Sequence, residues 1–88
     1  HRGMPPADRR EIDRRLQDIL ARRMKVSDEI GMIKKQHHMS VLQPDRYEAL
    51  MQSRVDQAEN LGLDRRFTMK ILAAIHAESV GRQLRLKD

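Results

Sequence analysis

The chain has 88 residues, of which 39% are hydrophobic and 2% aromatic, with no cysteine and a formal charge of +5. This length allows one domain, the lack of cysteine excludes disulfides and thiolate metal sites, and no apolar run approaches the roughly 20 residues that span a bilayer. Leu, Ile, Met, Val and Ala dominate the apolar residues, which favours packed helices over a sheet. We therefore expect one all-α, cytoplasmic domain without a membrane partner, whose positive charge favours anionic ligands.

A first helix is predicted from about residue 7 to about residue 36. The Pro-Pro pair before it suits the first helical turn, and Asp8 and Glu11 place negative charge at the positive end of the helix dipole. Residues 1–6 are expected to be a linker remnant. Apolar residues at spacings of three and four give the helix one apolar face, made of Ile12, Leu16, Ile19, Val26, Ile30 and Ile33.

Two cations interrupt this apolar face. Arg23 falls where the spacing predicts a core residue. Lys34 follows eleven residues later, so its side chain points within about 20° of that of Arg23 and lies about 16 Å farther along the axis. A charge is tolerated in a core only when it is paired, so these two positions call for an anionic partner.

Two shorter helices follow. The segment from Gln36 to Pro44 breaks the helical period and is predicted to be a loop, after which Pro44 suits the first position of a second helix. The apolar face of this helix comprises Tyr47, Leu50, Met51, Val55, Ala58 and Leu61. Gly62 can adopt the left-handed conformation that ends a helix, and Asp64 can cap a third helix that runs to about Leu86. The corresponding stripe of the third helix comprises Phe67, Ile71, Leu72, Ile75 and Ser79.

The length of the first helix predicts an oligomer. A helix of about 30 residues spans about 45 Å, whereas a compact globule of this size has a radius of gyration near 12 Å and a diameter of about 30 Å. One protomer therefore cannot cover its own first helix. We expect an intertwined helical homodimer in which a second chain covers the apolar face.

Polar residues from all three predicted helices form a coherent set. Three cations, amides and hydroxyls that converge inside a bundle would make a pocket for a small polyanion. In the alternative arrangement, Arg23 pairs with an Asp or Glu of a neighbouring helix and Gln83 is exposed. The chain offers no nucleophilic triad and no glycine-rich phosphate loop, so a reaction here would need neither a covalent nucleophile nor a cofactor. The set consists of Arg23, Lys34, Gln43, Arg46, Tyr47, Ser79 and Gln83.

The spacing of these residues resembles a known family. The motifs are "ID..L..IL..RM.....IG..K" from Ile12 to Lys34, an arginine at Arg46, "LGLD" from Leu61 to Asp64, and "ESV..Q" from Glu78 to Gln83. Together they resemble the all-helical chorismate mutases over nearly the whole chain. These motifs are similar to those of mutase domains that are fused to a 3-deoxy-arabino-heptulosonate 7-phosphate (DAHP) synthase.

The resemblance implies the rearrangement of chorismate, a dicarboxylate, to prephenate in aromatic amino-acid biosynthesis. It implies that Arg23 binds one carboxylate bidentately, and that Lys34 contacts the ether oxygen and a carboxylate. Gln83 matches the second donor to the ether oxygen, which gains negative charge as its bond to carbon stretches. Ser79 matches a residue at the ring carboxylate, and Arg46 matches an arginine that supports the site.

The chain departs from the family pattern at two places. The family has a carboxylate pair around the start of the second helix, where this chain has Gln43 and Tyr47, which can still hydrogen-bond a hydroxyl. The family also has an arginine near the start of the first helix that reaches into the partner's site. That position falls on Pro6, and Arg9 and Arg10 lie three and four residues out of phase.

Other functions stay open on the sequence alone. Isochorismate pyruvate lyases share the fold and the cations. A regulatory domain that binds chorismate or prephenate and controls a DAHP synthase would also need the pocket. The pair His37-His38 lacks a third metal ligand, so we expect solvated histidines. Basic turns such as Arg9-Arg10 lack interleaved aromatic residues, so we expect no nucleic-acid binding.

Overall fold

The computed structural model describes residues 6–86, which form three helices: α1 (Pro6–Gln36), α2 (Pro44–Asn60) and α3 (Arg65–Leu86). No strand occurs in this range, so the predicted all-α class is confirmed. The helix bounds agree with the predicted ones to within about a residue. Residues 1–5 of the predicted linker remnant lie outside the described range, and Pro6 is already the first residue of α1.

The local signals at the helix ends act as predicted. Pro44 occupies the first turn of α2. The backbone N–H of Phe67 donates to the Asp64 carboxylate at 2.9 Å, so Asp64 caps α3. Gly62 has a φ of 89°, a left-handed conformation that glycine adopts without a Cβ penalty. Leu61 was predicted to extend the apolar face of α2, which is wrong: it follows the last helical residue and is 81% exposed.

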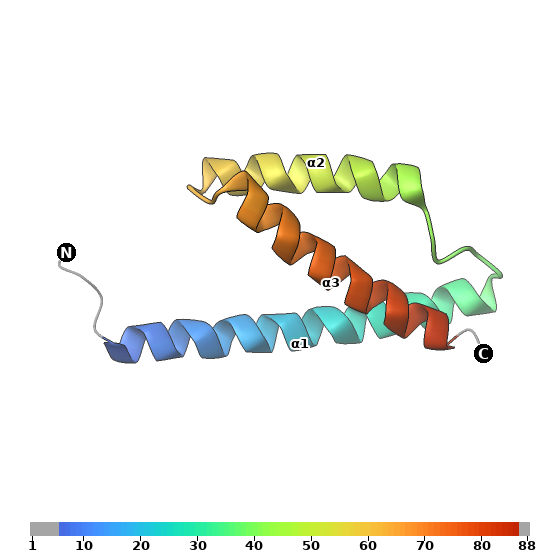
Figure 1. Cartoon of the computed structure of the whole chain (residues 1–88). Helices are drawn as coiled ribbons and strands as arrows, with labels where there is room; N and C mark the ends of the chain where they lie inside the picture. The colour runs from blue at the N-terminus through green and yellow to red at the C-terminus, as the bar shows by residue number, and fades with distance from the viewer. Residues whose placement is uncertain (1–5, 87–88) are drawn as a thin grey trace.

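α3 lies between the other two helices and joins them. It packs against the C-terminal half of α1 and against α2, whereas α1 and α2 are linked through α3 and the loop of residues 37–43 (Figure 1). The described chain measures 53 × 25 × 15 Å with a radius of gyration of 15.9 Å. A compact chain of this length would have a radius near 12 Å, so the protomer is elongated along α1.

The buried face of α1 is small and partly polar. Met24, Ser27 and Gly31 face α3, and a Cβ atom on Gly31 would lie 3.0 Å from Cγ of Gln83 and 3.2 Å from its Cα. Glycine at this position therefore allows the two helix backbones to approach closely. This close approach sets the depth at which Gln83 sits in the protein.

The predicted apolar face of α1 is exposed in a single chain. Ile12, Leu16 and Ile19 are 48%, 55% and 60% exposed. The predicted stripe of α3 is also uncovered at Phe67 and Ile71. The buried apolar residues of the described chain are only Met24, Val41, Val55 and Ala58. None of the described helices has the length and hydropathy to cross a membrane.

Candidate active site

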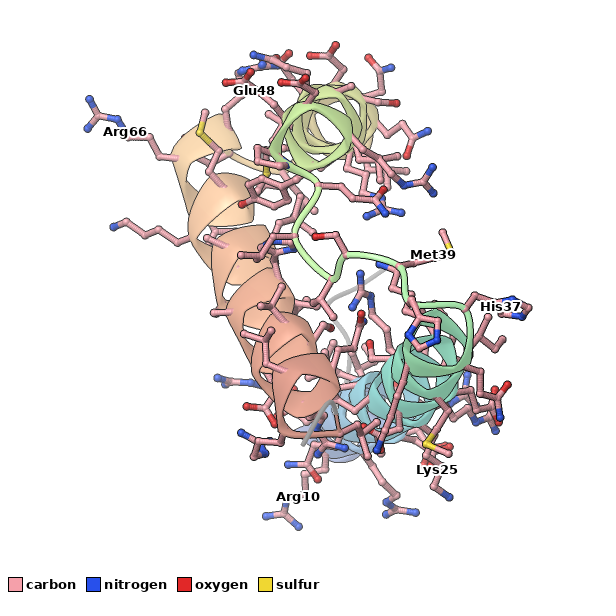
Figure 2. The ribbon with its side chains drawn as sticks, turned by 90° about the vertical axis from the view of Figure 1, so that its right-hand side faces the viewer. Arg10, Lys25, His37, Met39, Glu48 and Arg66 are labelled. Carbon is pink, nitrogen blue, oxygen red and sulfur yellow. The ribbon has the colours of Figure 1, made fainter. Side chains whose placement is uncertain are left out.

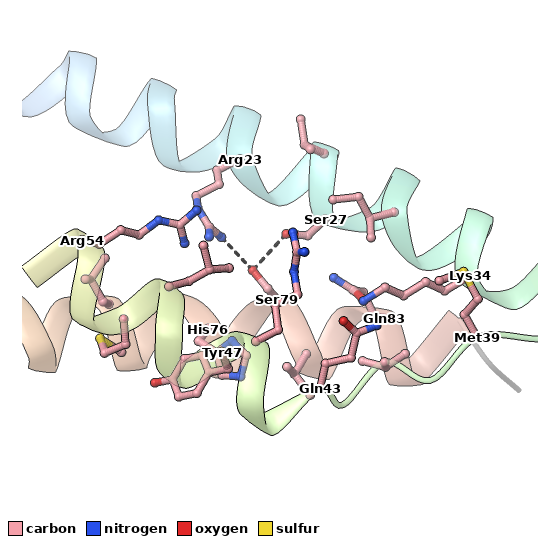
Figure 3. A pocket seen from close by; sticks show the side chains of 18 residues that line it. Arg23, Ser27, Lys34, Met39, Gln43, Tyr47, Arg54, His76, Ser79 and Gln83 are labelled. Carbon is pink, nitrogen blue, oxygen red and sulfur yellow. Dashed lines mark hydrogen bonds between the residues drawn. The ribbon is translucent and has the colours of Figure 1, made fainter.

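The three helices enclose a pocket of about 520 Å³ beside the C-terminal half of α1 (Figure 3). All seven residues of the predicted set line it, namely Arg23, Lys34, Gln43, Arg46, Tyr47, Ser79 and Gln83. α1 contributes the first two, the start of α2 and the residue before it contribute the next three, and α3 contributes the last two. The structure therefore brings these seven residues together around one pocket.

A hydrogen-bonded cluster is centred on Ser79. Arg23 donates to Oγ of Ser79 at 3.0 Å, and the Ser27 hydroxyl donates to the same oxygen at 2.9 Å. The Ser79 hydroxyl in turn lies 3.8 Å from Sδ of Met24, to which it donates. This arrangement fixes the Arg23 guanidinium at the pocket wall. The alternative in which Arg23 pairs with a carboxylate of a neighbouring helix is wrong for the described chain.

Partial burial and a neighbouring positive charge both act on Arg23. Removal of the guanidinium from water lowers its pKa, and the charge of Arg54 lowers it further. Arginine remains protonated despite such a shift. Arg23 is therefore a cation without a described carboxylate beside it. An anion bound at this point would supply the missing counterion and oppose the lowering of the pKa of Arg23.

The other end of the pocket combines a cation with two amides. Lys34, Gln43 and Gln83 lie close together there, away from Arg23 and Arg54 (Figure 3). Gln83 is only 8% exposed, and its Oε1 atom is buried without a hydrogen-bond partner among the described residues. An unsatisfied buried polar group costs about 1–3 kcal/mol. The prediction that Gln83 faces the pocket is confirmed, and the alternative that it is exposed is wrong.

An aromatic pair forms part of the wall between these ends. The rings of Tyr47 and His76 stack with centroids 3.8 Å apart and an interplanar angle of 26°. Burial lowers the pKa of His76, and the positive charge of Arg23 lowers it further. His76 is therefore neutral near pH 7, and the Tyr47 ring is fixed by its neighbour on α3.

The charge of the pocket lining has one sign. Arg23, Lys34, Arg46 and Arg54 line it, and none of its described lining residues is an aspartate or a glutamate. Cations that line a concave surface without carboxylates attract and retain an anion. No group of three or more His, Cys, Asp or Glu side chains that could hold a metal occurs within residues 6–86.

Three polar lining residues were missed at the level of sequence: Ser27, Arg54 and His76. Each had a periodicity signal. Ser27 lies four residues after Arg23, and His76 lies three before Ser79, so each shares a helix face with a predicted residue. Arg54 lies eight residues after Arg46, on the same face of α2. The signals were missed because each residue also suits an exposed helix surface.

Comparison with known families gives a match that covers most of the chain. The family model described as chorismate mutase type II matches residues 8–84. The chain belongs to the chorismate mutase type II family. The match includes every residue of the predicted set, all of α2, and all but the outermost two residues of α1 and of α3. Comparisons with curated proteins and with solved structures returned no match.

Proposed function

We propose that this chain is a chorismate mutase, an isomerase that converts chorismate to prephenate in the biosynthesis of phenylalanine and tyrosine. The observation that carries the proposal is a pocket with four cations and no carboxylate in its described lining, in a chain of this family. The substrate is a dicarboxylate, so its charge complements that lining. The proposed site requires no cofactor.

Substrate binding is the first task of the pocket. Arg23 is held by Ser79 with its guanidinium at the wall, where it can bind a carboxylate through two parallel N–H donors. Ser79 and Arg46 bind or support the ring carboxylate, and Gln43 and Tyr47 contact the ring hydroxyl. Fixing both ends of a flexible substrate favours the compact conformer from which the new bond forms.

Transition-state stabilisation is the second task. In the rearrangement a carbon–oxygen bond breaks while a carbon–carbon bond forms, and the ether oxygen gains negative charge. The Lys34 ammonium and the Gln83 amide N–H are the donors assigned to that oxygen. Because they are positioned before the reaction, little reorganisation is needed as the charge develops. The bond changes are concerted and intramolecular, so no protein nucleophile takes part.

The proposal includes a homodimer in which each α1 lies along the partner. The exposed apolar residues of α1 and the elongated shape of the protomer support it. Covering Ile12, Leu16 and Ile19 would remove from water the largest apolar surface that the first half of the helix offers. The two sites of such a dimer would lie beside the interface.

Two adjacent lysines allow a matched test of the enzymatic function. Lys34 lines the pocket, whereas Lys35 is exposed and does not. Loss of chorismate absorbance should show turnover above the uncatalysed rate for the wild type and for Lys35→Ala. Lys34→Ala should lose at least about 10²–10³-fold in kcat/KM, the usual cost of one transition-state donor. Equal rates for the two variants would contradict the proposed role of Lys34.

The departures at Gln43, Tyr47 and Pro6 favour one second candidate, a domain that binds chorismate or prephenate without turnover and controls a DAHP synthase, either fused to it or as a partner. Calorimetry with prephenate separates the two candidates, because tight binding without any catalysis would support the regulatory domain.

A lyase activity is tested by supplying isochorismate and identifying the product. Formation of pyruvate from isochorismate, without prephenate from chorismate, would replace the mutase assignment.

A further inference from the structure

Two arginines from different helices meet at one end of the pocket. Arg23 comes from α1 and Arg54 from α2, and Figure 3 shows the Arg54 side chain extending toward the Arg23 guanidinium. The two are close enough for the charge of Arg54 to act on Arg23. Two cations placed together repel each other unless an anion lies between them.

Neither arginine has an acidic partner in the described part of the chain. Arg23 donates only to Ser79, and no hydrogen bond or ion pair joins Arg54 to a described residue. Arg65, by contrast, contacts the carboxylates of Asp56 and Glu59. The pocket pair therefore places two positive charges together without a described counterion.

The family resemblance leaves one role without a residue. An arginine of the first helix should reach into the partner's site, yet that position is Pro6. Arg54 lies beside Arg23 without any contribution from a second chain. Two guanidiniums can bind one carboxylate from two sides, which fixes its orientation more firmly than one can.

We propose that Arg54 provides, from the same chain, the second guanidinium of the carboxylate subsite formed by Arg23, and so replaces the first-helix arginine of the family pattern. This assignment rests on the proposed function, because it names the part of the site that holds one substrate carboxylate. Arg54 is then a substrate-binding residue, and the carboxylate subsite is complete within one protomer.

The test compares Arg54→Gln with Arg66→Gln, which removes the same charge from an exposed arginine outside the pocket (Figure 2). Arg54→Gln should raise KM and the prephenate dissociation constant about tenfold or more, with a smaller change in kcat. Arg54→Lys should recover only part of this loss, because an ammonium lacks the planar fork. Arg66→Gln should leave both constants unchanged. An unchanged KM in Arg54→Gln would overturn the proposal.

Two further measurements distinguish Arg54 from other sources of the second guanidinium. Arg9→Gln and Arg10→Gln should not reproduce the loss, and a loss from either that exceeds that of Arg54→Gln would overturn the assignment. Mixing Arg23→Gln protein with Arg54→Gln protein should restore no site of normal affinity, because both residues serve the same protomer. Recovery in the mixture would show that Arg54 acts across an interface.

The failure of this proposal is separable from failure of the proposed function. If the wild type neither turns over chorismate nor binds prephenate, the mutase assignment fails by itself. The subsite is then tested by binding of malonate, which requires only that the site recognise a carboxylate. Wild-type and Arg66→Gln protein should bind malonate, and Arg54→Gln should bind it at least about tenfold more weakly. Equal malonate affinity for all three, or no malonate binding to any, would overturn the subsite.

Discussion

The two halves of α1 have the same spacing and different surroundings. In the first half, Ile12, Leu16 and Ile19 repeat along one face that no described residue covers. In the second half, Arg23 and Lys34 are on the pocket wall and Ser27 is buried against α3. One amphipathic pattern along α1 can therefore serve two purposes. Under the proposed function, the apolar positions form the dimer interface, and the polar substitutions in the same register form the substrate site.

The first half gives the largest expected effect. Ile19→Asp places a charge in the proposed interface twice per dimer, which should cost on the order of 4 kcal/mol and raise the dimer dissociation constant about a thousandfold. Gln17→Asp adds the same charge at an exposed position off the apolar face. Sedimentation equilibrium should show monomers for Ile19→Asp and dimers for Gln17→Asp. If both variants form dimers as tightly as the wild type, this half of α1 does not lie in the interface.

The second half can be perturbed at its closest contact. Gly31→Ala places a methyl group 3.0 Å from Cγ of Gln83 and from Cδ1 of Leu86, and 3.2 Å from Cα of Gln83, so these atoms of α3 must move by a few tenths of an ångström. We expect a net loss of about 1–3 kcal/mol in the free energy of unfolding and a fall in kcat as Gln83 moves.

The matched control for that change is Gly81→Ala on α3. Its added methyl group would meet only the end of the Arg85 side chain, at 3.4 Å. Because alanine is the better helix former, this variant should gain up to about 1 kcal/mol in thermal or urea unfolding. Stabilisation by both substitutions would show that the α1–α3 approach is not tight.

The centre of the pocket offers a smaller test through Ser79. Ser79→Ala removes the acceptor of the Arg23 and Ser27 bonds. Loss of the bond from Arg23 should raise KM about tenfold through a less ordered guanidinium, with the fold intact by circular dichroism. Ser53→Ala, at an exposed position of α2 outside the pocket, is the control. An unchanged KM for Ser79→Ala would show that the hydrogen bonds to Ser79 do not contribute to substrate binding.

The smallest effect is a pH dependence from His76. Its pKa is lowered in the folded protein, so below about pH 6.5 the unfolded chain takes up a proton that the folded chain resists. Stability should therefore fall as the pH falls through this range, and His76→Gln should show a shallower fall. The groups that face the pocket with it are Arg23, Lys34, Arg46, Tyr47 and Arg54, none of them acidic.

The affinity for prephenate should depend on pH in the direction opposite to that of stability. A bound dianion supplies the negative charge that the site lacks, so it favours protonated His76. Prephenate should bind more tightly as the pH falls below about 6.5, and His76→Gln should lose this trend. His37→Gln, in the loop outside the pocket, should keep it. Parallel pH profiles for all three proteins would exclude His76 as the titrating group.

The helices and the seven predicted pocket residues followed from local rules. Pro44, Gly62 and Asp64 fix the helix ends through backbone geometry, which acts over a few residues and is therefore readable in sequence. Arg23 stood out because a cation interrupted an apolar period. Arg54 did not stand out, since a basic residue on a short surface helix is ordinary and its importance depends on a neighbour 31 positions away.

The packing between helices was less predictable. The spacing marked Ile12 to Ile33 as the buried face of α1, whereas within one chain the face against α3 is Met24, Ser27 and Gly31. Small and polar residues there give little hydrophobic signal, although they let two backbones approach. The burial of Gln83 follows from this approach, so its depth could only be seen once α1 and α3 were placed together.

The most direct test of the proposed catalysis is the chorismate assay on the wild type and on Gln83→Ala, compared with Gln52→Ala at an exposed position of α2. We expect prephenate formation by the wild type and by Gln52→Ala, and a loss of about 10²–10³-fold in kcat for Gln83→Ala. A wild-type rate no higher than the uncatalysed reaction, or a Gln83→Ala variant as active as the wild type, would contradict the proposed catalysis.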